Sequence, residues 1–173
     1  DRDQMADPGE KTFFDVGADD IQKEFDLNMR GTWLPSKVMT PLLIGQQGAC
    51  VLNVSSMSAF TPLTRIPGYS GAKAGVSNFT QWLATYLARS GVRVNAIAPG
   101  FFMTEQNHAL QFNPDGTPTP RCAHIVDGTP MRRYGELKEL IGAMLFLVDE
   151  RAASFVTGIV LPVDGGYSAF SGV

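Results

Sequence analysis

Basic clusters, long apolar runs and cysteines are all scarce in this 173-residue chain. Lysine and arginine total 14 against 17 acidic residues, and the net charge of −3 gives no support for nucleic-acid binding. No apolar run reaches the roughly 20 residues that a membrane-spanning helix needs. Only Cys50 and Cys122 are cysteines, so a disulfide framework is not implied and a reduced, cytoplasmic protein is expected.

Metal-binding patterns are missing as well. His108 and His124 have no ligand spacing with the cysteines, so we expect no metal site. The composition itself, 44% apolar and 18% charged, is that of an ordinary globular protein. It predicts a single domain over residues 1–173.

Buried strands alternate with helical patterns along most of the chain. Apolar residues at four-residue steps predict a helix from about residue 19, which Pro35 and Pro41 should kink or interrupt before Gly45. Further helices are expected at 69–89 and 136–150, and apolar strands at 49–54, 92–98 and 159–163. Strands separated by helices predict right-handed crossovers in a parallel α/β sheet.

Residues 105–134 interrupt this pattern with repeated proline and glycine. A connection of this length in a compact domain is expected to be either a lid over a ligand or a flexible surface loop.

A tyrosine and a lysine lie one helical turn apart in Tyr69-Ser70-Gly71-Ala72-Lys73. Because residues four apart share a helix face, the Lys73 ammonium can favour the ionised form of Tyr69 and make it an acid/base catalyst. Ser56 ends the apolar strand thirteen residues earlier, where its hydroxyl can return to the phenol. Ser55 is the rival serine, and the spacing to Tyr69 favours Ser56.

Four motifs in order resemble the short-chain dehydrogenase/reductase family. They are Asn28 in Phe25-Asp26-Leu27-Asn28, the strand end Asn53-Val54-Ser55-Ser56, Tyr69 with Lys73, and Asn95 to Gly100 with Thr104 beyond. The resemblance implies the C-terminal part of a Rossmann-like, doubly wound parallel sheet with three strands. It also implies hydride transfer with NAD or NADP, NAD being favoured by resemblance alone.

The resemblance assigns a role to each of these residues. Tyr69 would be the proton donor, Ser56 would hold the substrate oxygen, and Lys73 would bind the nicotinamide ribose. Asn28 would sit at a helix irregularity and hold a water near Lys73, although an exposed or locally bonded side chain is the alternative. The nicotinamide would meet the strand exit, at Pro99, Gly100, Phe102 and Thr104. Relatives form homodimers or homotetramers, which we expect here too.

The glycine-rich turn that binds a dinucleotide pyrophosphate is not found in the sequence. By resemblance, the chain therefore corresponds to the C-terminal two-thirds of an enzyme. We expect negligible cofactor affinity for this chain alone, and NAD cannot be distinguished from NADP.

A narrower resemblance, to the D-mannonate oxidoreductase (fructuronate reductase) branch, rests on Ser58 to Pro67, Pro99 to Asn107 and the ending Asp164 to Val173. It implies a sugar-acid substrate. Arg65 would pair with its carboxylate, with a surface or subunit contact as the alternative, and Glu105 and Asn107 would bind hydroxyls. A different polyol, an alcohol or a 3-oxoacyl substrate stays open, as does an inactive fragment that acts only through assembly.

Overall fold

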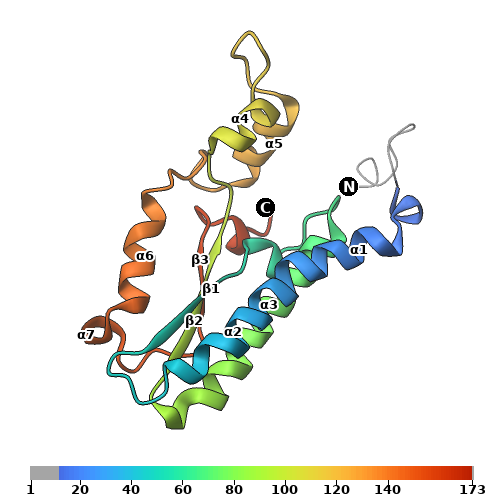
Figure 1. Cartoon of the computed structure of the whole chain (residues 1–173). Coiled ribbons are helices and arrows are strands. Elements are labelled where there is room, and N and C mark those ends of the chain that lie inside the picture. The colour runs from blue at the N-terminus through green and yellow to red at the C-terminus, as the bar shows by residue number, and fades with distance from the viewer. Residues whose placement is uncertain (1–11, 173) are drawn as a thin grey trace.

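A three-stranded parallel sheet forms the centre of the fold (Figure 1). The computed structural model describes residues 12–172, in which β1 (Cys50–Val54), β2 (Arg93–Pro99) and β3 (Val160–Val163) lie side by side in that order. Each predicted strand is confirmed to within one residue at either end. The central strand is fully enclosed, since Val94, Ala96 and Ala98 have no exposed surface. The predicted α/β class with a parallel sheet is confirmed.

Helices cover both faces of this sheet (Figure 1). On one face lie α1 (Ala18–Phe25), α2 (Gly31–Met39) and α3 (Pro67–Leu87). On the other lie α6 (Glu139–Val148) and α7 (Glu150–Ala153). Beyond the carboxyl ends of the strands stand α4 (Glu105–Gln111) and α5 (Pro120–Gly128).

The main apolar core lies between α3 and the sheet. Its buried members come from α3, from the two strands it covers and from the turns beside them: Ala49, Phe79, Leu83, Ala84, Leu87, Val92 and Val94. The opposite face is covered less completely, because Leu147 is buried on α6 while Ile141 and Leu145 are more than half exposed. The position of α3, which carries the Tyr69–Lys73 pair, is therefore set by this buried cluster.

Small residues on α3 let the first helix approach closely. A Cβ added at Gly68 would lie 3.0 Å from Ile21, and one at Gly75 would lie 3.2 Å from the sulfur of Met29. Ile21 and Met29 belong to the stripe that predicted the helix. Ile21 of α1 and Met29, just beyond the end of α1, thus fill the space that the α3 glycines leave.

The helix irregularity lies before Pro35, which corrects one expectation. Residues Asp26–Arg30 form a π-helical turn between α1 and α2. Pro35 sits inside α2, which continues through it without interruption to Met39. A proline has no N–H to donate to the carbonyl one turn earlier, yet the helical course of α2 is not broken at Pro35. The helix does end before Pro41, which lies in a 3₁₀ turn.

Two helices, α4 and α5, make up about half of the segment 105–134, where the sequence predicted no helix, and its role as a lid over a ligand stays a prediction. Thr104 and Thr119 cap α4 and α5, each accepting a hydrogen bond from a backbone N–H in the first turn. The segment begins and ends side by side, because Gly135 N–H donates to the Phe101 carbonyl at 2.9 Å and Met103 N–H donates to Gly135 at 3.1 Å. We refer to residues 103–134 as the helical arm.

The exits of β2 and β3 are in very close contact. Gly100 N–H donates to the Val163 carbonyl at 2.9 Å. A Cβ added at Gly100 would lie 2.6 Å from both Cα and Cβ of Asp164. Since Asp164 Cα is backbone, any side chain here must push the two strand exits apart.

We predict that Gly100→Ala destabilises the fold by about 1–3 kcal/mol, because the added methyl overlaps a neighbouring backbone. Urea unfolding measures the loss. Gly142→Ala in α6 is the matched control, since a Cβ there meets nothing within 4 Å and a helical glycine-to-alanine change is favourable by up to about 1 kcal/mol. Equal stability of the two variants would contradict the close contact.

Candidate active site

A lysine side chain joins the end of β1 to the first half of α3. Lys73 Nζ donates to the carbonyl of Val54 at 2.9 Å. Val54 is the last residue of β1, two residues before Ser56, and Lys73 lies one turn after Tyr69. The predicted serine, tyrosine and lysine are therefore carried by a strand end and a helix that are bonded to each other.

The connection between β1 and α3 is also fixed by hydrogen bonds. Leu63 N–H donates to Ser70 Oγ at 3.2 Å, and Ser70 N–H donates to the Ile66 carbonyl at 3.1 Å. These bonds hold the connecting segment against the first turn of α3. Tyr69 is positioned by that turn and is partly exposed.

The ammonium of Lys73 lies close to Tyr69 and is partly removed from water. Its Nζ is 5.7 Å from the centroid of the Tyr69 ring. Burial lowers the pKa of Lys73 from its usual 10.5, because desolvation disfavours the charged form. A positive charge here can stabilise negative charge that develops on the phenol oxygen.

The two serines at the end of β1 make different bonds. Ser55 Oγ donates to the Lys73 carbonyl at 3.1 Å and lies 2.6 Å from Ser77 Oγ. Both hydrogen bonds of the Ser55 hydroxyl are therefore made with α3. Ser56 Oγ accepts from Ser58 N–H and Ser58 Oγ at 3.2 and 3.0 Å. Within residues 12–172 Ser56 Oγ donates no hydrogen bond, which leaves its proton available to a ligand.

Asn28 lies in the π-helical turn, where the resemblance places a helix irregularity. Its amide donates to the Glu24 carbonyl and to Glu24 Oε2, both at 3.0 Å. Asn28 and Lys73 line the same cavity of about 400 Å³, which runs between α2 and β1. The structure thus brings the two residues to one space, and the bridging water stays a prediction.

Residues 99–104, at the exit of β2, present mainly backbone groups, and we refer to them as the shelf. Pro99 pairs with Val163 in the sheet. The Phe102 carbonyl accepts from Asn107 Nδ2 at 2.8 Å, while the Phe102 N–H donates to no residue in 12–172. Thr104 and Asn107 form a reciprocal capping box at the start of α4. Asn107 is thereby committed to local bonds, and its hydroxyl-binding role stays a prediction.

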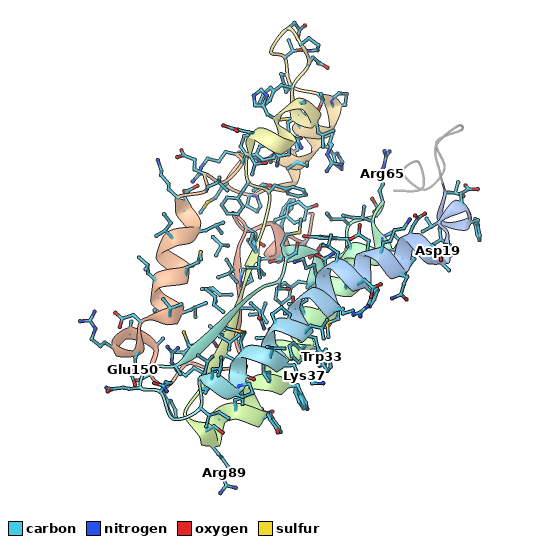
Figure 2. All side chains as sticks on the ribbon, in the orientation of Figure 1. Asp19, Trp33, Lys37, Arg65, Arg89 and Glu150 are labelled. Carbon is cyan, nitrogen blue, oxygen red and sulfur yellow. The ribbon has the colours of Figure 1, made fainter. Side chains whose placement is uncertain are left out.

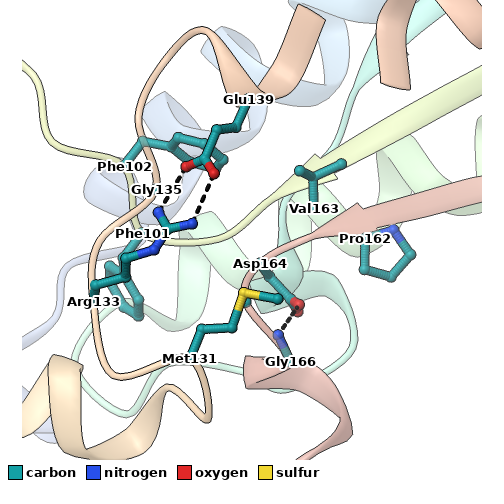
Figure 3. Close-up of a pocket in the computed structure, with 11 residues that line it drawn as sticks. Phe101, Phe102, Met131, Arg133, Gly135, Glu139, Pro162, Val163, Asp164 and Gly166 are labelled. Atoms are coloured by element: carbon teal, nitrogen blue, oxygen red, sulfur yellow. Dashed lines mark hydrogen bonds and ion pairs between the residues drawn. The ribbon is translucent and has the colours of Figure 1, made fainter. Parts of the chain in front are cut away.

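Two further cavities flank this shelf. One of about 380 Å³ is shown in Figure 3 and is lined by Phe101, Phe102 and the Asp164-Gly165-Gly166 turn. A two-pronged ion pair between Arg133 and Glu139 closes one side, with both N–O distances 2.7 Å. Hydrogen bonds from Arg133 and from the Glu136 N–H lower the pKa of Glu139 from 4.5 to about 2.

The other cavity, of about 550 Å³, contains the predicted Arg65. It lies between the segment preceding α3 and the start of α5, and Arg65, Arg121 and His124 are its basic lining residues. Arg65 projects from the segment before α3 (Figure 2). Glu105 is exposed in the first turn of α4 and lines none of these three cavities.

Arg121 and His124 are site candidates that the sequence analysis missed. Thr119 followed by Pro120 is a typical helix start, and this signal predicts α5 with the two residues three apart on it. Among residues 12–172 there is no group of three acidic, histidine or cysteine side chains suited to a metal ion. No helix in this part of the chain is both long and apolar enough to cross a membrane.

Comparisons with known proteins place these features in a family. Residues 5–168 match the family model described as Enoyl-(Acyl carrier protein) reductase. An uncharacterised oxidoreductase of Haemophilus influenzae is 56% identical over 163 residues, which are 94% of this chain and 57% of that protein.

Solved structures agree with the match. A Haemophilus structure with bound NAD, provisionally named a D-mannonate oxidoreductase, has a TM-score of 0.92 and 55% identity over 97% of this chain and 60% of its own. A structure with bound NADP from Agrobacterium tumefaciens, provisionally named 2-deoxy-D-gluconate 3-dehydrogenase, has a TM-score of 0.80 and 31% identity. It is matched over 91% of this chain and 62% of its own. The chain thus spans about three-fifths of the relatives it matches.

We predict that Lys73→Met removes a pH dependence of stability. Because the folded pKa lies below 10.5, the unfolded chain binds more protons between the two values, and wild-type stability rises with pH across that interval. Between pH 7 and 10.5, the free energy of unfolding measured with urea should rise for the wild type relative to the variant. Parallel curves would contradict a desolvated Lys73.

Glu139→Gln should destabilise the fold at neutral pH. The ion pair stabilises the fold only while Glu139 is ionised. The difference in free energy of unfolding between variant and wild type is therefore largest above pH 4.5 and disappears as the pH falls towards 2. Chemical unfolding at pH 7, 4.5 and 3 measures it, with Glu150→Gln at the start of α7 as the control. A difference that persists unchanged at low pH would refute the ion pair as its cause.

Proposed function

This chain belongs to the short-chain dehydrogenase/reductase family, and we propose that it carries the catalytic residues of an NAD(P)-dependent oxidoreductase. The reaction is transfer of a hydride between nicotinamide and a ketone or secondary alcohol of a sugar acid, of the fructuronate/mannonate type. The observation that carries the proposal is the bond from Lys73 to the end of β1, which holds Ser56 and Tyr69 on elements locked together.

The residues of the shelf fit the nicotinamide end of such a cofactor. Within residues 12–172 the Phe102 N–H donates no hydrogen bond, and Gly100 has no side chain to fill the space at the exit. Thr104 Oγ1 accepts a hydrogen bond from Asn107 N–H, and within the same residues its hydroxyl proton is not donated. The bound cofactor supplies or accepts the hydride. Two of the solved relatives hold NAD and NADP respectively, which supports either nucleotide here.

The side chains supply the proton chemistry. Ser56 donates a hydrogen bond to the substrate oxygen, and Tyr69 delivers a proton to that oxygen as negative charge develops on it. Lys73 stabilises the resulting phenolate, since its ammonium faces the ring. Asn28, beside Lys73 in the cavity along α2, is proposed to hold the water that returns a proton to the pair.

The sugar-acid assignment is supported by the named Haemophilus structure and by the Arg65 cavity. A different polyol, an alcohol or a 3-oxoacyl thioester is the alternative substrate, and the family description itself refers to an acyl carrier protein. The helical arm, which carries one wall of this cavity, is proposed to cover the substrate. The cytoplasmic location stays a prediction.

Exposed aromatic residues on the outer helices support assembly into a dimer or tetramer. Trp82 and Tyr86 stack on α3 at 5.2 Å between centroids and are 55% and 69% exposed. Within residues 12–172, β1 pairs only with β2, and several apolar residues of α6 are exposed. These unpaired surfaces also favour a second candidate function, a role through assembly alone.

Activity is tested with the purified chain and with a chimera that adds the part of the Haemophilus relative this chain does not cover. We expect the chimera to oxidise NADH with fructuronate and the chain alone to bind NADH negligibly. A chimera that folds, binds NADH and turns over none of a panel of sugar acids, polyols and 3-oxoacyl thioesters would leave assembly as the function.

In that chimera, Tyr69→Phe should lower turnover by at least about 100-fold, the usual contribution of a general acid. Tyr86→Phe, the same change on the exposed face of the same helix, should leave turnover unaltered. Initial rates at 340 nm and the unfolding temperature of each variant separate catalysis from folding. Equal rates for the two variants would exclude Tyr69 as the proton donor.

A further inference from the structure

The cavity between the segment before α3 and the start of α5 is basic, although the chain as a whole is acidic. Among the residues that the structure describes, its lining includes Arg65, Arg121 and His124 and neither aspartate nor glutamate, whereas the net charge of the chain is −3. The volume of about 550 Å³ is that of a small-molecule site. A cavity with this lining favours an anionic ligand.

Helix α5 presents two of these groups together. Arg121 and His124 are three residues apart and exposed, so they lie on one accessible helix face. Cys122 and Ile125, on the other face, are 4% and 7% exposed and anchor the helix. The N-terminus of α5 is fixed by the bond from Cys122 N–H to Thr119 Oγ1 at 3.2 Å. The two donors therefore come from an anchored helix.

The opposite wall of the cavity is rigidly joined to the candidate catalytic turn. Leu63 and Ile66 line the cavity, and both bond to Ser70 in the first turn of α3, next to Tyr69. Phe101 and Tyr167 form an aromatic side, with ring centroids 5.2 Å apart. A ligand here is held between α5 and the turn that carries Tyr69.

We infer that Arg121 and His124 bind the carboxylate of the substrate from the α5 side, with Arg65 facing them from the segment before α3. This inference rests on the proposed function and specifies its substrate class: a polyhydroxy acid whose anionic end lies in the cavity and whose reacting carbon extends towards Tyr69. Arginine suits this role because its planar guanidinium matches a carboxylate with two parallel hydrogen bonds.

A direct titration of the chain tests the site without cofactor. Sodium D-mannonate, neutral D-mannitol and inorganic phosphate are added to the ¹⁵N-labelled chain, and the amide shifts of residues 63–66 and 121–125 are followed. We expect mannonate to shift these signals and mannitol to leave them unchanged. Arg121→Gln should weaken mannonate binding about tenfold or more, as for loss of a charge-assisted bond. Arg89→Gln, in the 3₁₀ turn that follows the C-terminal end of α3 (Figure 2), is the matched control and should bind as wild type.

Equal binding of mannonate and mannitol, or unaltered binding by Arg121→Gln, would overturn the inference. Binding of phosphate in preference to mannonate would also overturn it and point to a phosphate-bearing thioester. In the chimera, turnover of mannonate with an unchanged KM in Arg121→Gln would refute the carboxylate site while the proposed function stands. Mannonate binding through Arg121 without turnover would refute the proposed function and leave the site.

Discussion

The parallel direction of the strands is the constraint on which the rest of the structure depends. Because β1, β2 and β3 run the same way, their carboxyl ends meet at one edge of the sheet. The segment that follows each strand therefore starts at that edge. Ser56, Gly100 and Asp164 follow the three strands in turn. Residues separated by more than a hundred positions thus share one rim, and the cavities of Figure 3 and of the Arg65 region open on it.

Lys73 connects the sheet to the proposed catalytic tyrosine at this rim. It donates to the last carbonyl of β1 and places its ammonium near the Tyr69 ring, so one side chain serves both the packing of α3 and the electrostatics of the phenol. Its partial burial disfavours the charged form, and the hydrogen bond to Val54 offsets some of that cost. The core beneath α3 fixes the helix that carries both residues.

Local patterns were sufficient to predict the strands, α3 and the Tyr69–Lys73 pair, because apolar periodicity and four-residue spacing are properties of short segments. The helices of the arm were not predicted because the prolines and glycines around them are typical of loops, and their local start signals are the capping threonines Thr104 and Thr119. The cavity formed by Arg65 and Arg121 was beyond local reading, since segments fifty residues apart create it only when the sheet places them together. The uninterrupted course of α2 through Pro35 likewise departs from the local pattern, because a proline inside a helix usually kinks or breaks it.

The paired bonds at Gly135 have a consequence for how this architecture diversifies. Two backbone hydrogen bonds hold the ends of the helical arm together, and Asn107 within the arm adds a side-chain bond to the Phe102 carbonyl, so the arm is a closed excursion that leaves and returns at one place. Lengthening such an excursion lowers the stability of the fold only slightly, because the entropy cost of closing it grows only with the logarithm of its length. For the proposed enzyme, the substrate range can therefore change by exchange or growth of the arm, as an interchangeable module, while the sheet and the proposed catalytic residues stay the same.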